Sequence, residues 1–284
     1  MLAVEEQLSL IDAGSAALDR VAKNLRRMRD SVLTSALALA RSAATGEERL
    51  GDLLREPLRN GHSAKASANG TIPILTLSAV TLGDFSARNV KVTAADPERV
   101  AKLWVQPGDL LIERSNTREL VGTTRLYSGP SNFAVFPDLI IRARMGPRVE
   151  PQYAEIVLRA PSSRRYFQRR AQGISGTMPK IDQSAIAELV LPVPSLQVQA
   201  EVIRSVQRDL SLIDAMEIAV ETANRRSSAL RSAVLGAAFS GALVSQDPSD
   251  EPVSDLLEGI AGKGSRSSDR RAHAGGARAL RNTA

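Results

Sequence analysis

The pattern of apolar and polar residues is helical near the start of the chain. Apolar side chains recur there every seven positions, at Ile11, Leu18, Leu25, Val32 and Leu39. Val21 and Met28 occupy intermediate positions of the same stripe, and charged residues such as Arg20 and Lys23 fill the other faces. This spacing is typical of a coiled-coil seam. It predicts a long helix within residues 1–45, with Gly46 as a stop signal.

A similar, weaker stripe lies near the other end of the chain, at Ile213, Met216, Val220, Ala223, Leu230 and Val234. It predicts a second long helix within residues 193–245, with Ser195 as a candidate N-cap and Gly241 as a stop. Ser227 and several alanines make this seam narrower, which suits a close approach of two helices.

The two helical segments are copies of each other. Residues 8–13 (LSLIDA) recur as residues 210–215, and the ungapped match continues through Arg29 with Arg231 and Leu37 with Phe239. Two related helices at opposite ends of a chain are most simply partners in an antiparallel pair. The expected seam comprises Ile11, Leu18, Leu25, Val32, Ile213, Val220 and Val234. The alternative is that each stripe packs separately on a globular core.

Residues 46–192 have a different pattern, with β-branched runs broken by Gly and Pro. Strands are expected at 71–77, 90–93, 110–114, 121–127, 133–144 and 186–191, and a helix at 153–170 interrupted near Pro161. The predicted fold class is therefore α+β, with one mixed domain flanked by two long helices that pair as an antiparallel coiled coil. Residues 247–258 are acidic and residues 259–284 are rich in Gly, Ser and Arg, and the whole range 246–284 is expected to form a disordered, solvated tail. The alternative for the tail is a weak phosphate-contacting arm.

Composition excludes several classes of site. The chain has no Cys and two His, His62 and His273, so thiol nucleophiles, disulfides and zinc sites rich in Cys or His are ruled out. No apolar run is long enough to span a bilayer, and the first residues are acidic where a signal peptide would be basic. We therefore expect a soluble cytoplasmic protein with no membrane partner.

The net charge of +6 permits an acidic partner such as nucleic acid. The clearest basic segment is 162–170, which carries four Arg and no acid, and whose Arg165 and Arg169 lie one helical turn apart. Residues 172–180 extend this chemistry, and residues 113–118 and 65–71 are further polar candidates. Expected DNA contacts are Arg114, Asn116, Arg118, Arg164, Arg165, Arg169, Ser175, Thr177 and Lys180. Each segment alone is more typical of a solvated surface, but three such segments in one domain of a basic chain favour DNA binding. An aromatic content of 3% argues against stacking on single-stranded bases.

Motifs of intrinsic catalysis are missing. The sequence has no phosphate-binding loop ending in Gly-Lys-Ser/Thr, no dinucleotide fingerprint and no nucleophile elbow. The scattered carboxylates have no spacing that indicates a glycosidase or nuclease. We therefore predict a protein that is not an enzyme.

Four motifs resemble the specificity (S) subunits of type I restriction–modification systems. They are residues 105–116 with 120–122 (VQPGDLLIERSN, LVG), the loop 173–181 (GISGTMPKI), the helix entry 191–199 (LPVPSLQVQ) and the helix end 238–244 (AFSGALV). With the repeated helix, the resemblance covers most of the chain. Family members usually carry two target-recognition domains, each followed by a long helix. Only one such domain is present here, so the chain resembles a half-length form.

The resemblance implies a DNA-recognition subunit that docks modification (methyltransferase) and restriction subunits. S-adenosylmethionine, ATP and Mg²⁺ are then expected on those partners, with no cofactor in this chain. A helix of about 35 residues spans roughly 50 Å, at about 1.5 Å per residue, and would set the spacing of two recognition domains. A homodimer, or a second half-subunit, would restore the missing domain, and a homodimer would read a palindromic bipartite site. Two other functions stay open: a coiled-coil scaffold whose mixed domain binds a protein, and an intrinsic nuclease or methyltransferase.

Overall fold

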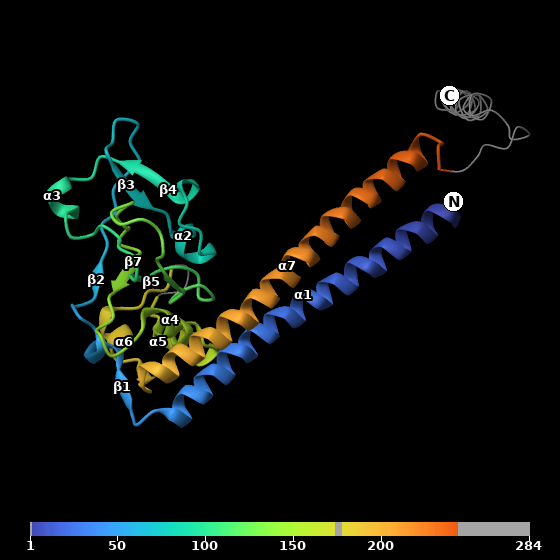
Figure 1. The fold of residues 1–284 in the computed structure, drawn as a ribbon. Helices are drawn as coiled ribbons and strands as arrows, with labels where there is room; N and C mark the ends of the chain where they lie inside the picture. The colour runs from blue at the N-terminus through green and yellow to red at the C-terminus, as the bar shows by residue number, and fades with distance from the viewer. Residues whose placement is uncertain (1, 174–177, 244–284) are drawn as a thin grey trace, which may run out of the picture. The chain divides into compact units, whose positions relative to one another are not determined.

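The computed structural model describes residues 2–173 and 178–243, which fall into two compact units (Figure 1). The main unit is Leu18–Ala223, and the terminal unit holds the described residues of Met1–Ala17 and Asn224–Ala284. Two long helices, α1 (Leu2–Ala43) and α7 (Leu196–Phe239), contribute residues to both units. The predicted tail, 246–284, lies outside the described residues. No helix in the described ranges is long and apolar enough to cross a membrane.

The two long helices run antiparallel within each unit, which confirms the predicted fold class. In the main unit Arg29 of α1 is 2.5 Å from Asp214 and 2.9 Å from Glu217 of α7. In the terminal unit Arg231 pairs with Asp12, and Ser15 lies 2.9 Å from Ser227. α7 ends at a left-handed Gly241, whose φ of 70° spares it the strain that a side chain would add.

The predicted seam has two inward positions in each heptad, the first at the seven-residue spacing and the second three residues later. The second position observed in the structure differs from the predicted one. Ile11, Leu25, Ile213 and Val234 are buried, and Leu18, Val32 and Val220 are half-buried. Val21, Met28, Met216 and Leu230, which occupy the predicted second positions of the stripe, are 44–53% exposed. Leu39, a predicted first position, is also 52% exposed. The inward positions are instead four residues after each first position, at Ser15, Ala22, Arg29 and Ala36, which are half-buried or buried. On a helix, the side chains three and four residues after a given position lie on opposite edges of the same stripe. Choosing the apolar residue of each such pair therefore placed the centre of the predicted stripe on the wrong edge.

A four-stranded antiparallel sheet lies at the centre of the mixed domain. Its order is β2 (Arg59–Asn60), β7 (Ile140–Ala143), β5 (Leu110–Glu113) and β6 (Thr124–Leu126). β5 and β7 are buried along their whole length, so their runs are almost continuously apolar. A hairpin of β3 (Ile72–Leu75) and β4 (Val90–Thr93) and a pair of β1 (Glu47–Arg49) with β8 (Val190–Pro192) complete the strands of the described ranges.

Short helices connect and cover the strands. They are η1 (Leu50–Leu53), α2 (Leu77–Leu82), η2 (Ala87–Asn89), α3 (Pro97–Val100), α4 (Pro151–Arg159), α5 (Pro161–Arg170) and α6 (Gln183–Ala187). The predicted break at Pro161 separates α4 from α5 because proline lacks the donor that a helix interior needs. The predicted strands 121–127 and 133–144 are shorter than expected, and the strand expected at 186–191 is wrong in its first residues. Ile186 belongs to α6, which Asp182 caps by accepting from the Ala185 amide at 2.7 Å.

The mixed domain rests on α1 and α7 within the main unit. Leu33, Ala36, Leu37 and Ala40 of α1 share one buried cluster with Leu50, Tyr153 and Ile186 of the domain and with Val202 and Val206 of α7. Gln199 is fully buried and ties the start of α7 to the domain by accepting from the Glu150 amide and donating to the carbonyls of Arg148 and Pro194. The domain is thus fixed to the helix pair by apolar packing and by a buried amide.

Candidate nucleic-acid interface

Two segments that the sequence singled out lie side by side at the end of β5. The Ile181 amide donates to the carbonyl of Arg114 at 2.9 Å, and Ser115 forms a bridge with Lys180. Lys180 also exchanges both backbone hydrogen bonds with Gln172, at 2.8 and 2.9 Å. The stretch 114–118 and the ends of the 172–180 segment therefore form one surface, although they are far apart in sequence.

Helix α5 reaches the same surface through Arg164. Its guanidinium donates to the carbonyls of Val121 at 3.0 Å and Glu119 at 2.7 Å, and Gln168 donates to Glu119 at 3.3 Å. Burial lowers the pKa of Arg164, and the charge of Glu113 opposes that change. Arg164 thus holds the 117–122 turn in place.

A buried carboxylate anchors the other side of this turn. Glu113 is fully buried and accepts from the Thr81 hydroxyl of α2 at 2.5 Å and from the Asn116 amide at 2.6 Å. The Asn116 carbonyl accepts from the Thr117 amide at 2.8 Å, which starts the turn. Burial raises the pKa of Glu113, while those two hydrogen bonds and the charges of Arg164 and Arg125 act in the other direction. Nearby on β6, burial lowers the pKa of Arg125 to about 10.

The predicted DNA contacts therefore divide into internal and outward-facing side chains. Asn116 is 7% exposed, and both ends of its amide, like the guanidinium of Arg164, are used within the protein. Within the protein both side chains hold the 114–122 turn in place, and their contact with DNA stays a prediction. Arg118, Arg165, Arg169 and Lys180 are exposed and Arg114 is half-buried, and none of these five has an ion pair within the described residues. Ser175 and Thr177 lie outside the described residues.

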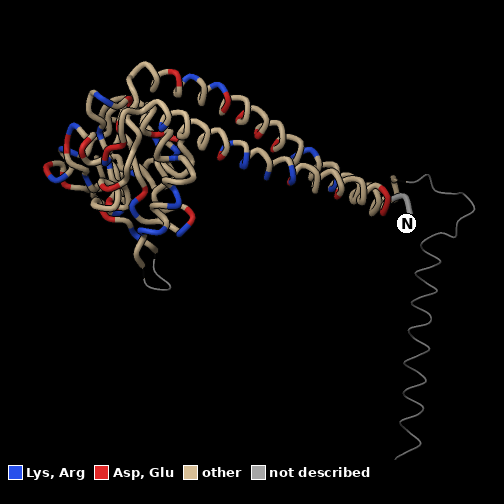
Figure 2. The backbone as a smooth tube through the Cα atoms, turned by 90° about the horizontal axis from the view of Figure 1, so that it is seen from below, with Lys and Arg blue, Asp and Glu red and all other residues tan. Residues whose placement is uncertain are grey.

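The third polar candidate does not join this surface. In residues 65–71 the amides of Ser67 and Thr71 donate to the carbonyls of Val92 and Thr93, both at 3.1 Å. That segment belongs to the β3–β4 hairpin, and among the described residues no hydrogen bond links it to the 114–122 turn. Figure 2 shows basic and acidic positions interspersed over the mixed domain, so the exposed arginines and Lys180 do not form a large single-sign face.

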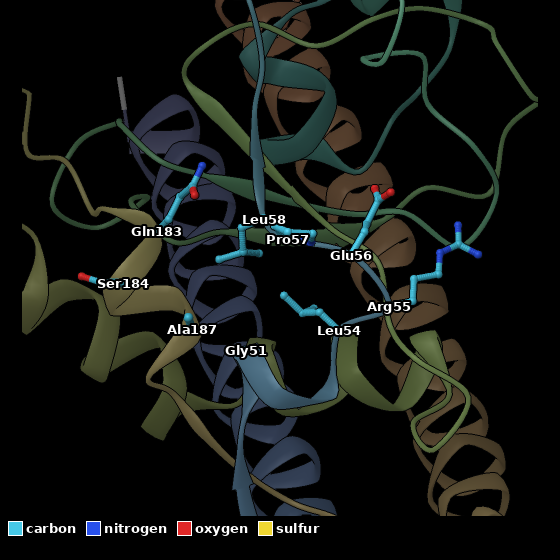
Figure 3. Close-up of a pocket in the computed structure, with 9 residues that line it drawn as sticks. All are labelled: Gly51, Leu54, Arg55, Glu56, Pro57, Leu58, Gln183, Ser184 and Ala187. Atoms are coloured by element: carbon cyan, nitrogen blue, oxygen red, sulfur yellow. The ribbon is translucent and has the colours of Figure 1, made fainter.

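A cavity of about 540 Å³ lies elsewhere in the domain (Figure 3). Leu54, Leu58 and Ala187 give it apolar walls, and Glu56, Arg55 and Gln183 give it polar ones. None of the predicted DNA contacts lines it. Within the described ranges, no group of three His, Cys, Asp or Glu side chains could hold a metal ion.

Sequence reasoning missed a buried ion network beside this cavity. Asp109 is fully buried and accepts from Arg144 at 2.5 and 3.1 Å, and Arg142 lies 3.8 Å from it. Glu56 lies 3.1 Å from Arg142 and 3.4 Å from Arg144. The hydrogen bond to Asp109 raises the pKa of Arg144, whereas burial lowers that of Arg142. The Pro107-Gly-Asp turn was a signal in the sequence for Asp109, but no such signal marked its two partners, Arg142 on β7 and Arg144 just after it.

Comparison with known proteins supports the resemblance seen in the motifs. No protein-family model matches the chain. The EcoKI specificity subunit of Escherichia coli (strain K12) is 29% identical over 265 residues, which cover 89% of this chain and 56% of the relative. The StySPI specificity subunit of Salmonella potsdam is 26% identical over 263 residues, with the same two coverages. The chain thus spans about half the length of the curated relatives that it matches.

The fold has a counterpart among solved structures. A chain from a study of complex assembly and conformational transition of the type I R-M system matches 84% of this chain and 60% of its own length, with a TM-score of 0.51 and 19% identity. At that identity the match concerns the fold alone. Together, the sequence similarity along most of the chain and the shared fold confirm the resemblance to the type I restriction enzyme specificity subunits, about half of whose length this chain spans.

Proposed function

We propose that the chain is a non-catalytic, cytoplasmic DNA-recognition subunit of a type I restriction–modification complex. The observation that carries this proposal is its similarity, over 89% of its length, to two specificity subunits. The lack of catalytic motifs in the sequence is consistent with the same role. Reaction chemistry would then belong to the partner subunits.

The surface around the 114–122 turn is the proposed site of contact with duplex DNA. Arg118, Arg165 and Arg169 are exposed and have no ion pair among the described residues, and arginine suits both phosphates and guanine edges. Glu113 and Arg164 hold the turn from two sides, so its exposed residues sit on a fixed backbone. A rigid support lowers the ordering cost of binding.

We propose the partners of this chain from its similarity to type I specificity subunits. Methyltransferase and restriction subunits would dock on this chain and would carry S-adenosylmethionine, ATP and Mg²⁺. A second recognition domain would come from a homodimer or from another half-subunit. A homodimer would bind a palindromic bipartite target, because a two-fold axis relates its two domains.

Salt-dependent binding of duplex DNA tests this function. The full chain, alone and with a type I methyltransferase subunit, is titrated with fluorescent duplexes over a range of salt concentrations. We expect affinity to fall steeply with salt, and the triple variant Arg118→Ala, Arg165→Ala, Arg169→Ala to have a salt slope smaller by about 0.9 per lost phosphate contact. Arg99→Ala is the matched control, since Arg99 is exposed on α3, away from this surface.

The alternatives give different results in the same experiment. A coiled-coil scaffold predicts no measurable duplex binding even with the methyltransferase subunit present. An intrinsic nuclease or methyltransferase predicts product from the isolated chain.

A further inference from the structure

Arg125 on β6 was not among the predicted DNA contacts, yet it carries a charge without a counter-charge in contact. Its side chain is half-buried, and no ion pair of the described residues involves it. Its guanidinium donates to the carbonyl of Thr124, the residue before it, at 3.3 Å. A guanidinium has five N–H donors. Most of the donors of Arg125 are therefore left for a ligand or for water.

Two other arginines act on Arg125 from neighbouring helices. Burial lowers the pKa of Arg125 to about 10, so the guanidinium keeps its charge at neutral pH. After burial, the charge of Arg159 on α4 lowers this pKa most, and the charge of Arg29 on α1 lowers it further. Glu155 and Glu113 act in the opposite direction. The strongest single charge effect on Arg125 therefore comes from another cation.

Arg159 and Arg29 have carboxylate partners of their own, unlike Arg125. Arg159 lies 3.4 Å from Glu155, and Arg29 bridges two carboxylates of α7 at 2.5 and 2.9 Å. These ion pairs hold the two guanidiniums in place on either side of β6 without supplying a partner to Arg125. We call Arg125, Arg159 and Arg29 the Arg125 site.

The end of α2 leaves room for the Arg125 side chain. Gly83 follows α2 with a φ of 71°, and a Cβ at this position would lie 2.9 Å from the Nε atom of Arg125. A side chain there would be strained and would press on the guanidinium. Thr81 of the same helix donates to Glu113 at 2.5 Å, so α2 links the Arg125 site to the carboxylate that anchors the 114–122 turn.

The Arg125 site lies where the mixed domain meets α1, within the main unit. Leu126, the next residue of β6, packs against the buried cluster that contains Val157 of α4 and Leu33 of α1. The 114–122 turn joins β5 to β6 and ends three residues before Arg125. The site is therefore adjacent to the proposed DNA surface, at the junction with the helix pair.

This placement of a cation costs stability in the free protein. A half-buried charge loses part of its hydration, and a second cation nearby adds repulsion. Perturbed charges of this kind cluster at functional sites, where a ligand of opposite charge relieves the cost. An anion bound beside Arg125 would supply the counter-charge that the described residues lack.

We infer that the Arg125 site binds a phosphate group of the DNA backbone. A planar guanidinium matches a phosphate with two parallel hydrogen bonds, and β6, α4 and α1 each bring one to the same junction. The adjacent 114–122 turn favours a phosphate of duplex DNA over a free phosphate ion. The source of the phosphate rests on the proposed function, whereas the site itself rests on the contacts above. Through Arg29, α1 takes part in binding and does not only carry the domain.

Arg125→Met tests the inference because it keeps the aliphatic stem and removes the charge. In the full chain without DNA, we expect the thermal unfolding midpoint to rise by about 2 °C or more, since the repulsion and the cost of burying the charge are gone. Affinity for duplex DNA should fall about tenfold, and the salt slope should fall by about 0.9 for one lost phosphate contact. A residue that only supports the fold would lower the midpoint.

Two further variants separate the charge from its shape and from its position. Arg125→Lys keeps the charge but loses the planar fork, so it should keep the salt slope while binding duplex DNA less tightly than wild type. Arg99→Met, at an exposed position on α3, should change neither the unfolding midpoint nor DNA affinity.

Inorganic phosphate tests the site without DNA. The unfolding midpoints of wild type and Arg125→Met are compared in phosphate and in chloride at equal ionic strength. Phosphate stabilises folded proteins in general, and this effect is the same for both chains. Binding at the site adds a shift that depends on phosphate concentration. We expect the extra shift in wild type and in Arg99→Met and not in Arg125→Met.

Three results would overturn the inference. They are a lower unfolding midpoint for Arg125→Met, equal phosphate shifts in wild type and Arg125→Met, and wild-type DNA affinity and salt slope in Arg125→Met. The last result would exclude the DNA backbone as the source of the phosphate. If wild type binds no duplex DNA, the proposed function fails, and the phosphate comparison alone decides whether the site exists.

Discussion

The mixed domain and the helix pair hold their polar groups in opposite ways. In the domain, Asp109 and Glu113 are fully buried, and each is bonded by at least two partners from different elements. In the helix pair, inward positions hold Ser15 and Arg29, which remain partly exposed. Polar groups in the domain therefore fix one arrangement at a high cost of desolvation. Those of the helix pair set the register of two helices while keeping access to water.

The largest expected effect is at Asp109, because its removal takes from Arg142 and Arg144 the fully buried one of the two carboxylates that they share and leaves them only the partly exposed Glu56. Asp109→Ala should lower the free energy of unfolding by about 3–5 kcal/mol, the usual result of breaking a buried pair from one side. Urea unfolding followed by circular dichroism measures it. Glu98→Ala, at an exposed position on α3, should change stability little. Equal effects of the two variants would mean that the network is not what holds β5 to β7.

The second effect is a change of the free energy of unfolding with pH, caused by Glu113. Because burial raises the pKa of Glu113, the folded protein binds the proton more tightly than the unfolded chain does. The stability from this group is fully present below the ordinary glutamate pKa and is lost as pH rises through the higher pKa of the folded state. Unfolding free energies of wild type and Glu113→Gln, measured between acid and neutral pH, should therefore diverge with pH. Parallel curves would show that the carboxyl titrates normally.

Glu113→Gln also tests the turn that Glu113 supports. The variant leaves one acceptor oxygen where Glu113 has two, so Thr81 and Asn116 cannot both keep their hydrogen bonds, and the 114–122 turn should loosen without loss of any exposed arginine. Under the proposed function, discrimination between specific and non-specific duplexes should fall while the salt slope stays unchanged, since phosphate contacts set that slope. A changed slope with intact discrimination would contradict a positioning role.

The next largest expected effect concerns two equivalent ion pairs of the helix pair. Arg29 is 23% exposed and bridges two carboxylates, whereas its repeat equivalent Arg231 is 48% exposed and pairs with Asp12. Arg29→Met should lower the free energy of unfolding by about 1 kcal/mol, and Arg231→Met should lower it by about 0–0.5 kcal/mol, because water screens exposed ion pairs. Thermal unfolding at low and high salt measures both. If Arg231→Met costs more than Arg29→Met, burial does not control these ion pairs.

The sequence predicted the helices better than the surface of the domain. Ile11 and Ile213 follow the local seven-residue period, which predicts an inward position whatever the partner helix is. The exposed Val21 and Met28 show the limit, because the sequence alone does not tell whether these residues or their neighbours Ala22 and Arg29 face the partner helix. Asn116 and Arg164 show another limit, since the groups that suit a DNA base also suit a carboxylate, as in Asn116, or a backbone carbonyl, as in Arg164. The approach of Lys180 to Ser115 is a long-range pairing that leaves no local pattern.

The smallest expected effect is at the hydroxyl pair of Ser15 and Ser227, 2.9 Å apart and partly buried in the terminal unit. Either single change to Ala leaves one hydroxyl without its partner and should cost about 0.5–1 kcal/mol. The double variant should be close to wild type, because removing both polar groups also removes the cost of burying them. A double-mutant cycle in urea measures the coupling. If the losses in the free energy of unfolding are additive, each hydroxyl is hydrogen-bonded by water. The seam then tolerates these two serines because solvent reaches them, and not because of the hydrogen bond between them.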